Sequence, residues 1–407
     1  MKVLFVHQNF PGQYLHLARH LGGAKDNQIA FITQREGVSL PGVTNIVYKP
    51  QRPVTRDVHH YLRETEAGVL NAQAVARVAL DLKQSGFKPD VMLGHCGWGE
   101  TLYLKDVFPE TPLIGYFEFF YRRHGADVGF DPDEKLLFDA GPRVRTKNLG
   151  NLLALDAVDH GQCPTAWQKS LYPKQYQSML HVIHEGIDTQ NVVPNPGARF
   201  RIPDSSVELT AADEVVTYVA RNLEPYRGFP SFMRSLPAIL ERRPNAHVLV
   251  VGGDETSYGR GLPDGRTYKQ QMLDELGTAL DFRRVHFLGK VPYSVFVNIL
   301  QISRAHVYLT YPFVLSWSML EAMSAGCLVI GSRTAPVEEV IRDGENGLLV
   351  DMFSPAEIAD RVISALAEPQ AYAEIRENAR RTIVERYDLK TICLPEQLRL
   401  LERVCVG

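Results

Sequence analysis

The sequence predicts an α/β protein with two domains, each built on a parallel β-sheet that helices cover on both faces. Short apolar runs of strand character alternate with helical patterns along nearly the whole chain. The stretch 189–214 interrupts this alternation with turn-forming residues and no apolar periodicity, which predicts a linker. The length of 407 residues also suits two or three domains, at about 150 residues for each domain.

The N-terminal half opens with a strand–loop–helix–strand unit. The apolar run 3–6 predicts a strand, a helix with its apolar residues on one side follows it, and 29–33 predicts the next strand. The alternation continues with a long helix at 61–85 and with strands at 90–93, 113–117, 157–160 and 180–183. Since parallel strands need a crossover connection, usually a helix, this order predicts a parallel sheet.

After the predicted linker the same alternation restarts. The expected strands lie at 215–220, 247–251, 285–288, 306–309 and 328–331, and the expected helices at 229–241, 315–325 and 389–404. We therefore expect a first domain at 1–188, a linker at 189–214 and a second domain at 215–388, with 389–407 packing back on the first domain. Ligands bind parallel sheets at the carboxyl ends of the strands, so the expected site is the cleft between the domains.

Charge and cysteine content exclude several classes of protein. The formal net charge is −3 with no basic run, which argues against nucleic-acid binding and against a polybasic membrane anchor. The five cysteines are widely spaced and form no C-x-x-C, so a reduced, cytoplasmic compartment is the expectation. The longest uncharged stretch, 305–320, is too short for a transmembrane segment, and the N-terminus turns polar too early for a signal peptide.

Two arginines flank a turn at the end of the first strand of the second domain. Arg221 and Arg227 stand on either side of this turn, and Gly228 leads into the next helix. Arginine grips phosphate with a fork of donors, and a helix N-terminus favours anions, so the pair suits a diphosphate. The alternative, two solvated loop arginines, stays open from this segment alone.

A second candidate segment precedes and opens the helix at 315–325. Ser316 or Ser318 can cap this helix, and the first N–H groups would then point at a ligand. Glu321 follows in the first turns, where its carboxylate can accept hydrogen bonds from the vicinal hydroxyls of a ribose. The small and apolar neighbours of Glu321 favour a functional acid over a solvated one.

The first domain offers acceptor-side candidates. An acid, aromatic residues and arginines occupy 118–124 at the end of a strand, and this segment contains Glu118, Tyr121 and Arg122. Aromatic faces stack on sugars and arginines bind anions, although Phe119 and Phe120 can equally be core residues. His95 ends another strand on the expected cleft. The histidine spacing fits no strong zinc pattern, so we expect no metal.

Four segments of the second half resemble the retaining family 4 glycosyltransferases of the GT-B fold. They are 221–228, 285–291, 320–326 and 343–350, in the family's order. The resemblance implies two Rossmann-like domains facing a cleft, a nucleotide-sugar donor and transfer to a hydroxyl acceptor with retention of anomeric configuration. It implies no cofactor and no metal.

The resemblance also implies roles for individual residues. It places Arg221 and Arg227 on the donor diphosphate and Glu321 on the ribose, with the backbone at Lys290 and Val291 reading the base. A glycine-rich loop near the donor phosphate corresponds to Gly12. The remaining donor-side candidates are Ser316, Trp317 and Ser318 at the helix start.

Departures from the family pattern keep a second hypothesis open. The first acid of the family's paired-glutamate motif is Phe313 here, and the family's donor-proximal histidine is Glu118. We take Glu118 as a candidate catalytic residue. The alternative is a sugar-nucleotide-binding protein with lost or weak turnover. A phosphorylase or an epimerase of the same fold is disfavoured, because no lysine has a cofactor-like setting and the four segments fit a transferase.

The expected ligands follow from the same resemblance. We expect a UDP-sugar first and a GDP-sugar second as the donor, with a sugar or glycan as the acceptor. A lipid-linked acceptor stays open, and nucleic acid is not expected.

Overall fold

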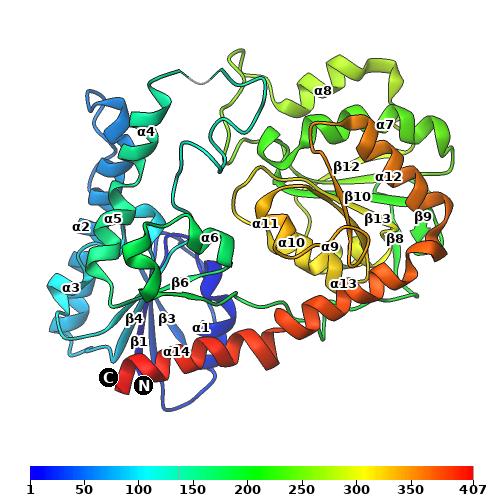
Figure 1. Cartoon of the computed structure of the whole chain (residues 1–407). Helices are drawn as coiled ribbons and strands as arrows, with labels where there is room; N and C mark the ends of the chain where they lie inside the picture. Colours follow the sequence, from blue (N-terminus) through cyan, green and yellow to red (C-terminus); the bar gives the residue numbers. More distant parts are fainter. Residues whose placement is uncertain (136, 407) are drawn as a thin grey trace. The chain divides into compact units, whose positions relative to one another are not determined.

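The computed structural model describes residues 1–135 and 137–406. These residues form two compact units, one made of 1–186 and 389–407 and the other of 187–388. Each unit contains its own parallel sheet (Figure 1). Among the described residues, no helix combines the length and the apolar character needed to cross a bilayer.

The first unit is a parallel sheet with the strand order β3-β2-β1-β4-β5-β6-β7. Its strands are β1 (Lys2–Val6), β2 (Gln28–Thr33), β3 (Val43–Val47), β4 (Val91–His95), β5 (Leu113–Tyr116), β6 (His160–Cys163) and β7 (Leu180–Val182). Its helices are α1 (Leu15–Gly22), α2 (Arg63–Gln84), α3 (Leu104–Val107), α4 (Ala140–Lys147), α5 (Leu149–Ala157), α6 (Ala166–Ser170) and α14 (Leu394–Val406).

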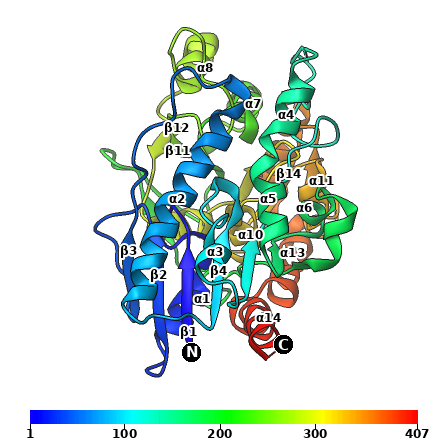
Figure 2. The same cartoon turned by 90° about the vertical axis from the view of Figure 1, so that its left-hand side faces the viewer.

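Helices α1 and α14 cover one face of this sheet. Side chains alternate along a strand, so Val3 and Phe5 point to the same face. They share a core with the α14 residues Leu400 and Leu401. Figure 1 shows α14 running along the sheet next to α1. Figure 2 shows α2 and α5, which contact each other on the same unit.

The second unit has the strand order β12-β11-β10-β13-β14-β15 and a small β8-β9 hairpin. Its strands are β8 (Arg199–Arg201), β9 (Glu208–Thr210), β10 (Val215–Asn222), β11 (His247–Gly253), β12 (Val285–Gly289), β13 (Ala305–Tyr308), β14 (Leu328–Ser332) and β15 (Leu348–Val350). Its helices are α7 (Phe229–Arg242), α8 (Tyr268–Leu276), α9 (Tyr293–Gln301), α10 (Trp317–Ser324), α11 (Ala335–Glu338), α12 (Pro355–Ala367) and α13 (Ala373–Arg386).

Both sheets reverse their strand order at one point. The reversal lies between β1 and β4 in the first unit and between β10 and β13 in the second. At such a point the connections leave toward opposite faces, and a crevice opens beyond the carboxyl ends of the two strands. Ligand-binding residues are therefore expected in the loops after these strands.

Two sequence predictions differ from the structure. The strand expected at 157–160 is β6 at His160–Cys163, because α5 continues through Ala157 and Gly161 hides the apolar pattern of the strand. The stretch expected to be a linker contains the β8-β9 hairpin, whose residues Phe200 and Leu209 pack into a core with Leu249. Turn-forming residues around short strands gave this hairpin the appearance of a linker.

Candidate active site

Arg227 lies at the strand-order reversal of the second unit. It closes the short 3-10 turn Pro225–Arg227 after β10, and it is buried. Its Nη1 donates to the Tyr308 hydroxyl at 3.1 Å, to Thr310 Oγ1 at 2.8 Å and to the Val314 carbonyl at 3.1 Å. The guanidinium therefore ties the end of β10 to the end of β13 and to the loop before α10.

Arg221 has a different environment from Arg227. It lies in the last part of β10 and is exposed. Its positive charge reaches the carboxylate of Glu255, which forms an exposed ion pair with Lys290 at 2.9 Å. Exposed pairs contribute little to stability, so an anionic ligand can compete with Glu255 for Lys290 and Arg221.

The N-terminus of α10 is organised by the same hydrogen-bond network. Ser316 caps this helix, and its Oγ accepts a hydrogen bond from the Ser318 N–H at 3.3 Å. The Ser316 N–H donates to the Tyr308 hydroxyl at 2.8 Å, the group that also accepts from Arg227. Tyr308 thus fixes the guanidinium and the positive end of the helix relative to each other.

Glu321 lies one turn further along α10 and is 8% exposed. Burial raises the pKa of this carboxyl above its usual range. The hydroxyl of Tyr293, at the start of α9, donates to Glu321 Oε1 at 2.7 Å. The hydrogen bond from Tyr293 therefore fixes the orientation of the carboxylate. The second carboxylate oxygen of Glu321 can accept a hydrogen bond from a ligand hydroxyl.

Glu224 is a second buried acid, and the sequence reading missed it. Its side chain is fully buried. The carboxylate accepts from the backbone N–H groups of Ser257 at 3.0 Å, Tyr258 at 3.0 Å and Gly259 at 2.9 Å. It therefore holds the loop after β11 against the turn after β10. The sequence feature that could have indicated Glu224 is an acid between the apolar Leu223 and the turn that begins at Pro225.

Aromatic rings surround the position where the family pattern has an acid. Phe313 is buried, and its ring centroid lies 5.6 Å from that of Tyr226 and 5.0 Å from that of Tyr258. The Arg227 guanidinium carbon lies 5.3 Å from the Tyr258 centroid. Phe313 therefore belongs to an apolar wall next to the buried arginine. Trp317 and Val291 are half-buried and pack against the core of the same unit.

In the first unit, a hydrogen-bonded chain leads from β1 to Glu118. His7 Nδ1 accepts from the Asn9 N–H at 2.9 Å, so the ring proton is on Nε2, which lies 2.6 Å from Gln13 Oε1. Burial lowers the pKa of His7 to about 3, so the ring is neutral. Gln13 Nε2 then donates to Glu118 Oε1 at 2.9 Å. At Gly12, where φ is +54°, a Cβ would lie 2.5 Å from His7 Nε2, so the turn requires glycine.

His95 approaches Glu118 from the other side. Its Nδ1 accepts from the Gly97 N–H at 3.0 Å, which again leaves the proton on Nε2. That nitrogen is buried and lies 3.6 Å from Glu118 Oε2. The ring stacks on Trp98 at 4.2 Å and on Tyr116 at 5.3 Å. The Glu118 side chain is 27% exposed, so it remains accessible to a ligand.

Several of the acceptor-side candidates line one pocket of the first unit. Tyr121 and Arg122 line a pocket of about 580 Å³ together with Arg123. Arg122 Nε also donates to the Leu171 carbonyl at 2.6 Å, which fixes the side chain. Phe119 and Phe120 are buried at 6% and 7% exposure, and Phe120 also lines this pocket. The pocket is thus basic and partly aromatic.

Within the described residues, the structure assembles the predicted site residues into separate groups. Arg227, Ser316 and Ser318 form one connected group through Tyr308, and Glu321 follows on the same helix. In the first unit His95 faces Glu118, and Gly12 lies next to His7, which Gln13 connects to Glu118. Among residues 1–135 and 137–406, no group of three or more His, Cys, Asp or Glu is placed to hold a metal ion.

Two family models match consecutive parts of the chain. Residues 25–192 match "Glycosyl transferase family 4 group", and residues 203–382 match "Glycosyl transferases group 1". Together they cover most of the sequence, including both groups of candidate residues except the Gly12 loop.

Curated relatives are similar over part of their length. The D-inositol 3-phosphate glycosyltransferase of Corynebacterium glutamicum is 26% identical over 202 residues, which is 49% of this chain and 46% of the relative. The phosphatidyl-myo-inositol mannosyltransferase of Mycobacterium tuberculosis is 26% identical over 268 residues, or 59% of this chain and 66% of the relative. The chain thus spans about half the length of the first of these.

Solved structures share the fold over the whole chain. HepE from Anabaena, in complex with UDP and glucose, has a TM-score of 0.70 and 17% identity, covering 99% of each chain. Sucrose-phosphate synthase from Thermosynechococcus elongatus has a TM-score of 0.73 and 14% identity, covering 100% of each chain. The predicted fold of two Rossmann-like parallel α/β domains is confirmed. With its two doubly wound units and matches to both family models, the chain belongs to the family 4 glycosyltransferases of the GT-B fold.

Proposed function

We propose that this protein moves a sugar from a nucleotide-sugar donor to a hydroxyl acceptor, with retention of anomeric configuration and without a metal ion. One observation carries this proposal. Arg227, the α10 N-terminus and Glu321 are fixed in one connected arrangement at the strand-order reversal of the second unit. That arrangement offers a cation, a helix dipole and a carboxylate in the order that a diphosphate and a ribose need.

In this proposal the second unit holds the donor. Arg221, Arg227 and the start of α10 at Ser316–Ser318 bind the diphosphate, and Glu321 binds the ribose. The backbone at Lys290 and Val291 reads the base. The HepE complexes contain UDP or UDP-glucose, which supports a UDP-sugar as the first choice. A GDP-sugar is the second choice.

The leaving diphosphate gains negative charge as the glycosidic bond breaks. Fixed positive groups aimed at that charge lower the barrier, because they need no reorganisation during the reaction. The acceptor hydroxyl attacks on the face that the diphosphate leaves, and a phosphate oxygen takes its proton. The positive groups of this chain therefore replace a metal ion at the diphosphate.

Glu118 is the proposed acidic group at the reacting centre. Gln13 holds one carboxylate oxygen and His95 faces the other, so the side chain has a fixed position. A fixed carboxylate stabilises an oxocarbenium-like sugar or orients the acceptor hydroxyl.

The acceptor is proposed to bind the basic pocket around Tyr121 and Arg122. Arginines favour a phosphorylated or otherwise anionic acceptor, and the aromatic ring favours a sugar-like ring. The names of two relatives specify an inositol phosphate and a phosphatidylinositol, which supports a polyol phosphate and keeps a lipid-linked acceptor in the proposal. None of the five cysteines, all of which lie within the described residues, forms a disulfide, which supports a reducing, cytoplasmic compartment.

A binding protein with lost or weak turnover is the second candidate function. Phe313 favours it, because an aromatic wall replaces the acid that the family pattern places near the donor sugar. Both candidates bind a nucleotide sugar, so a binding test must come before a turnover test.

The first test is a thermal-shift panel of UDP-, GDP- and ADP-sugars. Binding to the folded state stabilises by RT ln(1+[L]/Kd), so a ligand at about 100 times its Kd adds roughly 2.7 kcal/mol. We expect the UDP-sugars to raise Tm most. No shift with any nucleotide sugar, at concentrations up to several millimolar, would remove both candidate functions.

Glu321→Gln should weaken nucleotide binding by about 1–2 kcal/mol, since a charge-assisted bond to ribose becomes a neutral one. Calorimetry with UDP measures this loss. Inorganic diphosphate, which lacks the ribose, is the control ligand and should bind the variant as it binds the wild type. An equal loss for both ligands would assign Glu321 to the fold. Tyr293→Phe, which leaves the charge in place, should cause a smaller loss.

A further inference from the structure

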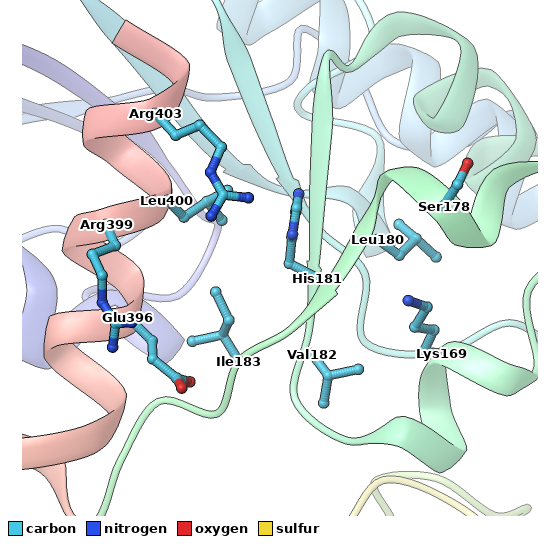
Figure 3. A pocket seen from close by; sticks show the side chains of 10 residues that line it. All are labelled: Lys169, Ser178, Leu180, His181, Val182, Ile183, Glu396, Arg399, Leu400 and Arg403. Atoms are coloured by element: carbon cyan, nitrogen blue, oxygen red, sulfur yellow. The ribbon is translucent and has the colours of Figure 1, made fainter. Parts of the chain in front are cut away.

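A second pocket of the first unit lies between its edge strand and its C-terminal helix. It has a volume of about 470 Å³ and is lined by residues of α6, β7 and α14. Figure 3 shows Lys169 on one side of the pocket, His181 in its centre, and Arg399 and Arg403 on the helix opposite. None of these residues belongs to the candidate active site.

The charge of this pocket is strongly positive for a chain with a net charge of −3. Lys169, Arg399 and Arg403 face a single acidic side chain in the lining, Glu396. Across residues 1–135 and 137–406, none of the three cations takes part in an ion pair. Arg399 only donates from Nε to the Pro395 carbonyl at 3.3 Å. The cluster therefore keeps a net positive charge.

The pKa of His181 depends on the positive charges of the cluster. Burial lowers its pKa below the usual value, and His160, Arg403 and Lys169 lower it further. The two histidine rings are close, with His181 Nε2 at 3.4 Å from His160 Nδ1. Figure 3 shows the side chains of Arg403 and Lys169 extending toward His181 from opposite sides. Cations that line one pocket repel each other, and an anion bound between them relieves that repulsion.

The floor of the pocket contains buried apolar side chains. Leu180, Ile183 and Leu400 are buried at 1%, 8% and 4% exposure. A pocket of this size accommodates a small organic molecule, because ligand sites fall at about 300–1,000 Å³. A ligand with an anionic head and a compact body would therefore meet cations at the rim and aliphatic groups beneath.

We propose that this pocket is a second ligand site, which binds a phosphate group carried by a small molecule or by a lipid headgroup. The guanidinium groups of Arg399 and Arg403 suit phosphate oxygens, which they can contact with paired N–H donors. Lys169 adds a point charge from the other side, and His181 supplies a ring nitrogen between them.

The position of the pocket gives such a ligand a structural effect. Strand β7 ends at Val182, shortly before the first unit ends at Gly186, and α14 follows the return of the chain at Leu389. A phosphate that contacts His181 and the two arginines would bridge these two segments. Binding should therefore stabilise the packing of α14 on the first unit.

The test follows His181 by NMR in the full chain labelled at its histidines, with His181→Gln to assign the signal. Inorganic phosphate is titrated at constant ionic strength. We expect a saturable upward movement of the His181 titration midpoint, because a bound anion favours the protonated ring. The Arg399→Gln/Arg403→Gln variant should weaken phosphate binding by about 10-fold or more, since charge-assisted hydrogen bonds are lost. The matched control is Arg19→Gln/Arg77→Gln, which removes the same charge from exposed positions of the same unit.

A second arm identifies the source of the phosphate group. Phosphatidylcholine vesicles, with and without phosphatidylinositol, are sedimented with each variant. Arginine-dependent binding to phosphatidylinositol vesicles supports a lipid headgroup, whereas a saturable phosphate effect without vesicle binding supports a soluble ligand. The proposal is overturned if neither arm gives saturable binding, or if the control variant loses binding as much as the pocket variant does.

Discussion

Glu118→Gln should lower kcat by about 100-fold or more while changing nucleotide affinity by less than about 3-fold. The substitution keeps the shape of the side chain and removes its negative charge. An amide can still accept from Gln13, but its NH2 group would then face the Nε2–H of His95, so donor would meet donor. The nucleotide is unaffected because the second unit is proposed to hold it. Steady-state kinetics and calorimetry measure the two quantities.

Glu110→Gln is the matched control, because Glu110 is an exposed acid of the same unit. It should leave both quantities unchanged. If Glu118→Gln reduces binding and rate equally, the role of Glu118 is structural. Unchanged kinetics would remove Glu118 from the reaction.

Arg221→Ala and Arg227→Ala should both reduce turnover by about 100-fold or more, since each removes a positive group from the leaving diphosphate. They should differ in stability. Arg221 is exposed, so its loss should leave Tm unchanged. Arg227 is buried and donates to Tyr308, Thr310 and Val314, so its loss should cost about 2–4 kcal/mol.

Differential scanning calorimetry separates the two effects. Arg201→Ala, at an exposed position of β8, is the matched control and should change neither Tm nor turnover. Arg227→Lys keeps the charge but not the fork of donors, so it should recover only part of the stability. Near-wild-type turnover in Arg221→Ala would remove that arginine from the diphosphate site.

The periodicity of the sequence was sufficient to predict most of the sheet strands, because buried parallel strands are short apolar runs between helices. β10 and β11 illustrate this, since their expected and observed starts coincide at Val215 and His247. The periodicity did not predict β3 and β15, because β3 is an edge strand of mixed polarity and β15 is short. Edge strands bury less surface and so show less pattern.

The site was predictable where a residue type is unusual for its place, as with Glu321 among small apolar neighbours. It was not predictable where function depends on pairing across the fold. Tyr308 joins Arg227 to Ser316 across distant parts of the sequence, and nothing local distinguishes it from a core tyrosine. The chain from His7 through Gln13 to Glu118 likewise requires β1 and β5, which β4 separates, to end at the same edge of one sheet.

An exposed ion pair of Lys290 lies at the proposed donor site. Lys290 pairs with Glu255, and the positive charge of Arg221 also acts on the Glu255 carboxylate. A nucleotide that binds here must compete with Glu255 for these cations. Glu255→Gln should therefore tighten nucleotide binding by a few-fold, in contrast to the loss expected for Glu321→Gln. Calorimetry with UDP at low and high salt measures the change, which should shrink as salt screens the pair.

Sugar transfer itself is the central claim, and a time-resolved proton NMR experiment tests it most directly. The wild-type protein is incubated with the UDP-sugar that gives the largest thermal shift and with a panel of polyol, sugar-phosphate and lipid-linked acceptors. We predict that the donor is consumed, that UDP appears in equal amount with a glycosylated acceptor, and that the new linkage keeps the anomeric configuration of the donor. Binding of the donor without its consumption by any acceptor would contradict the transferase and leave a nucleotide-sugar-binding protein, and an inverted linkage would contradict retention.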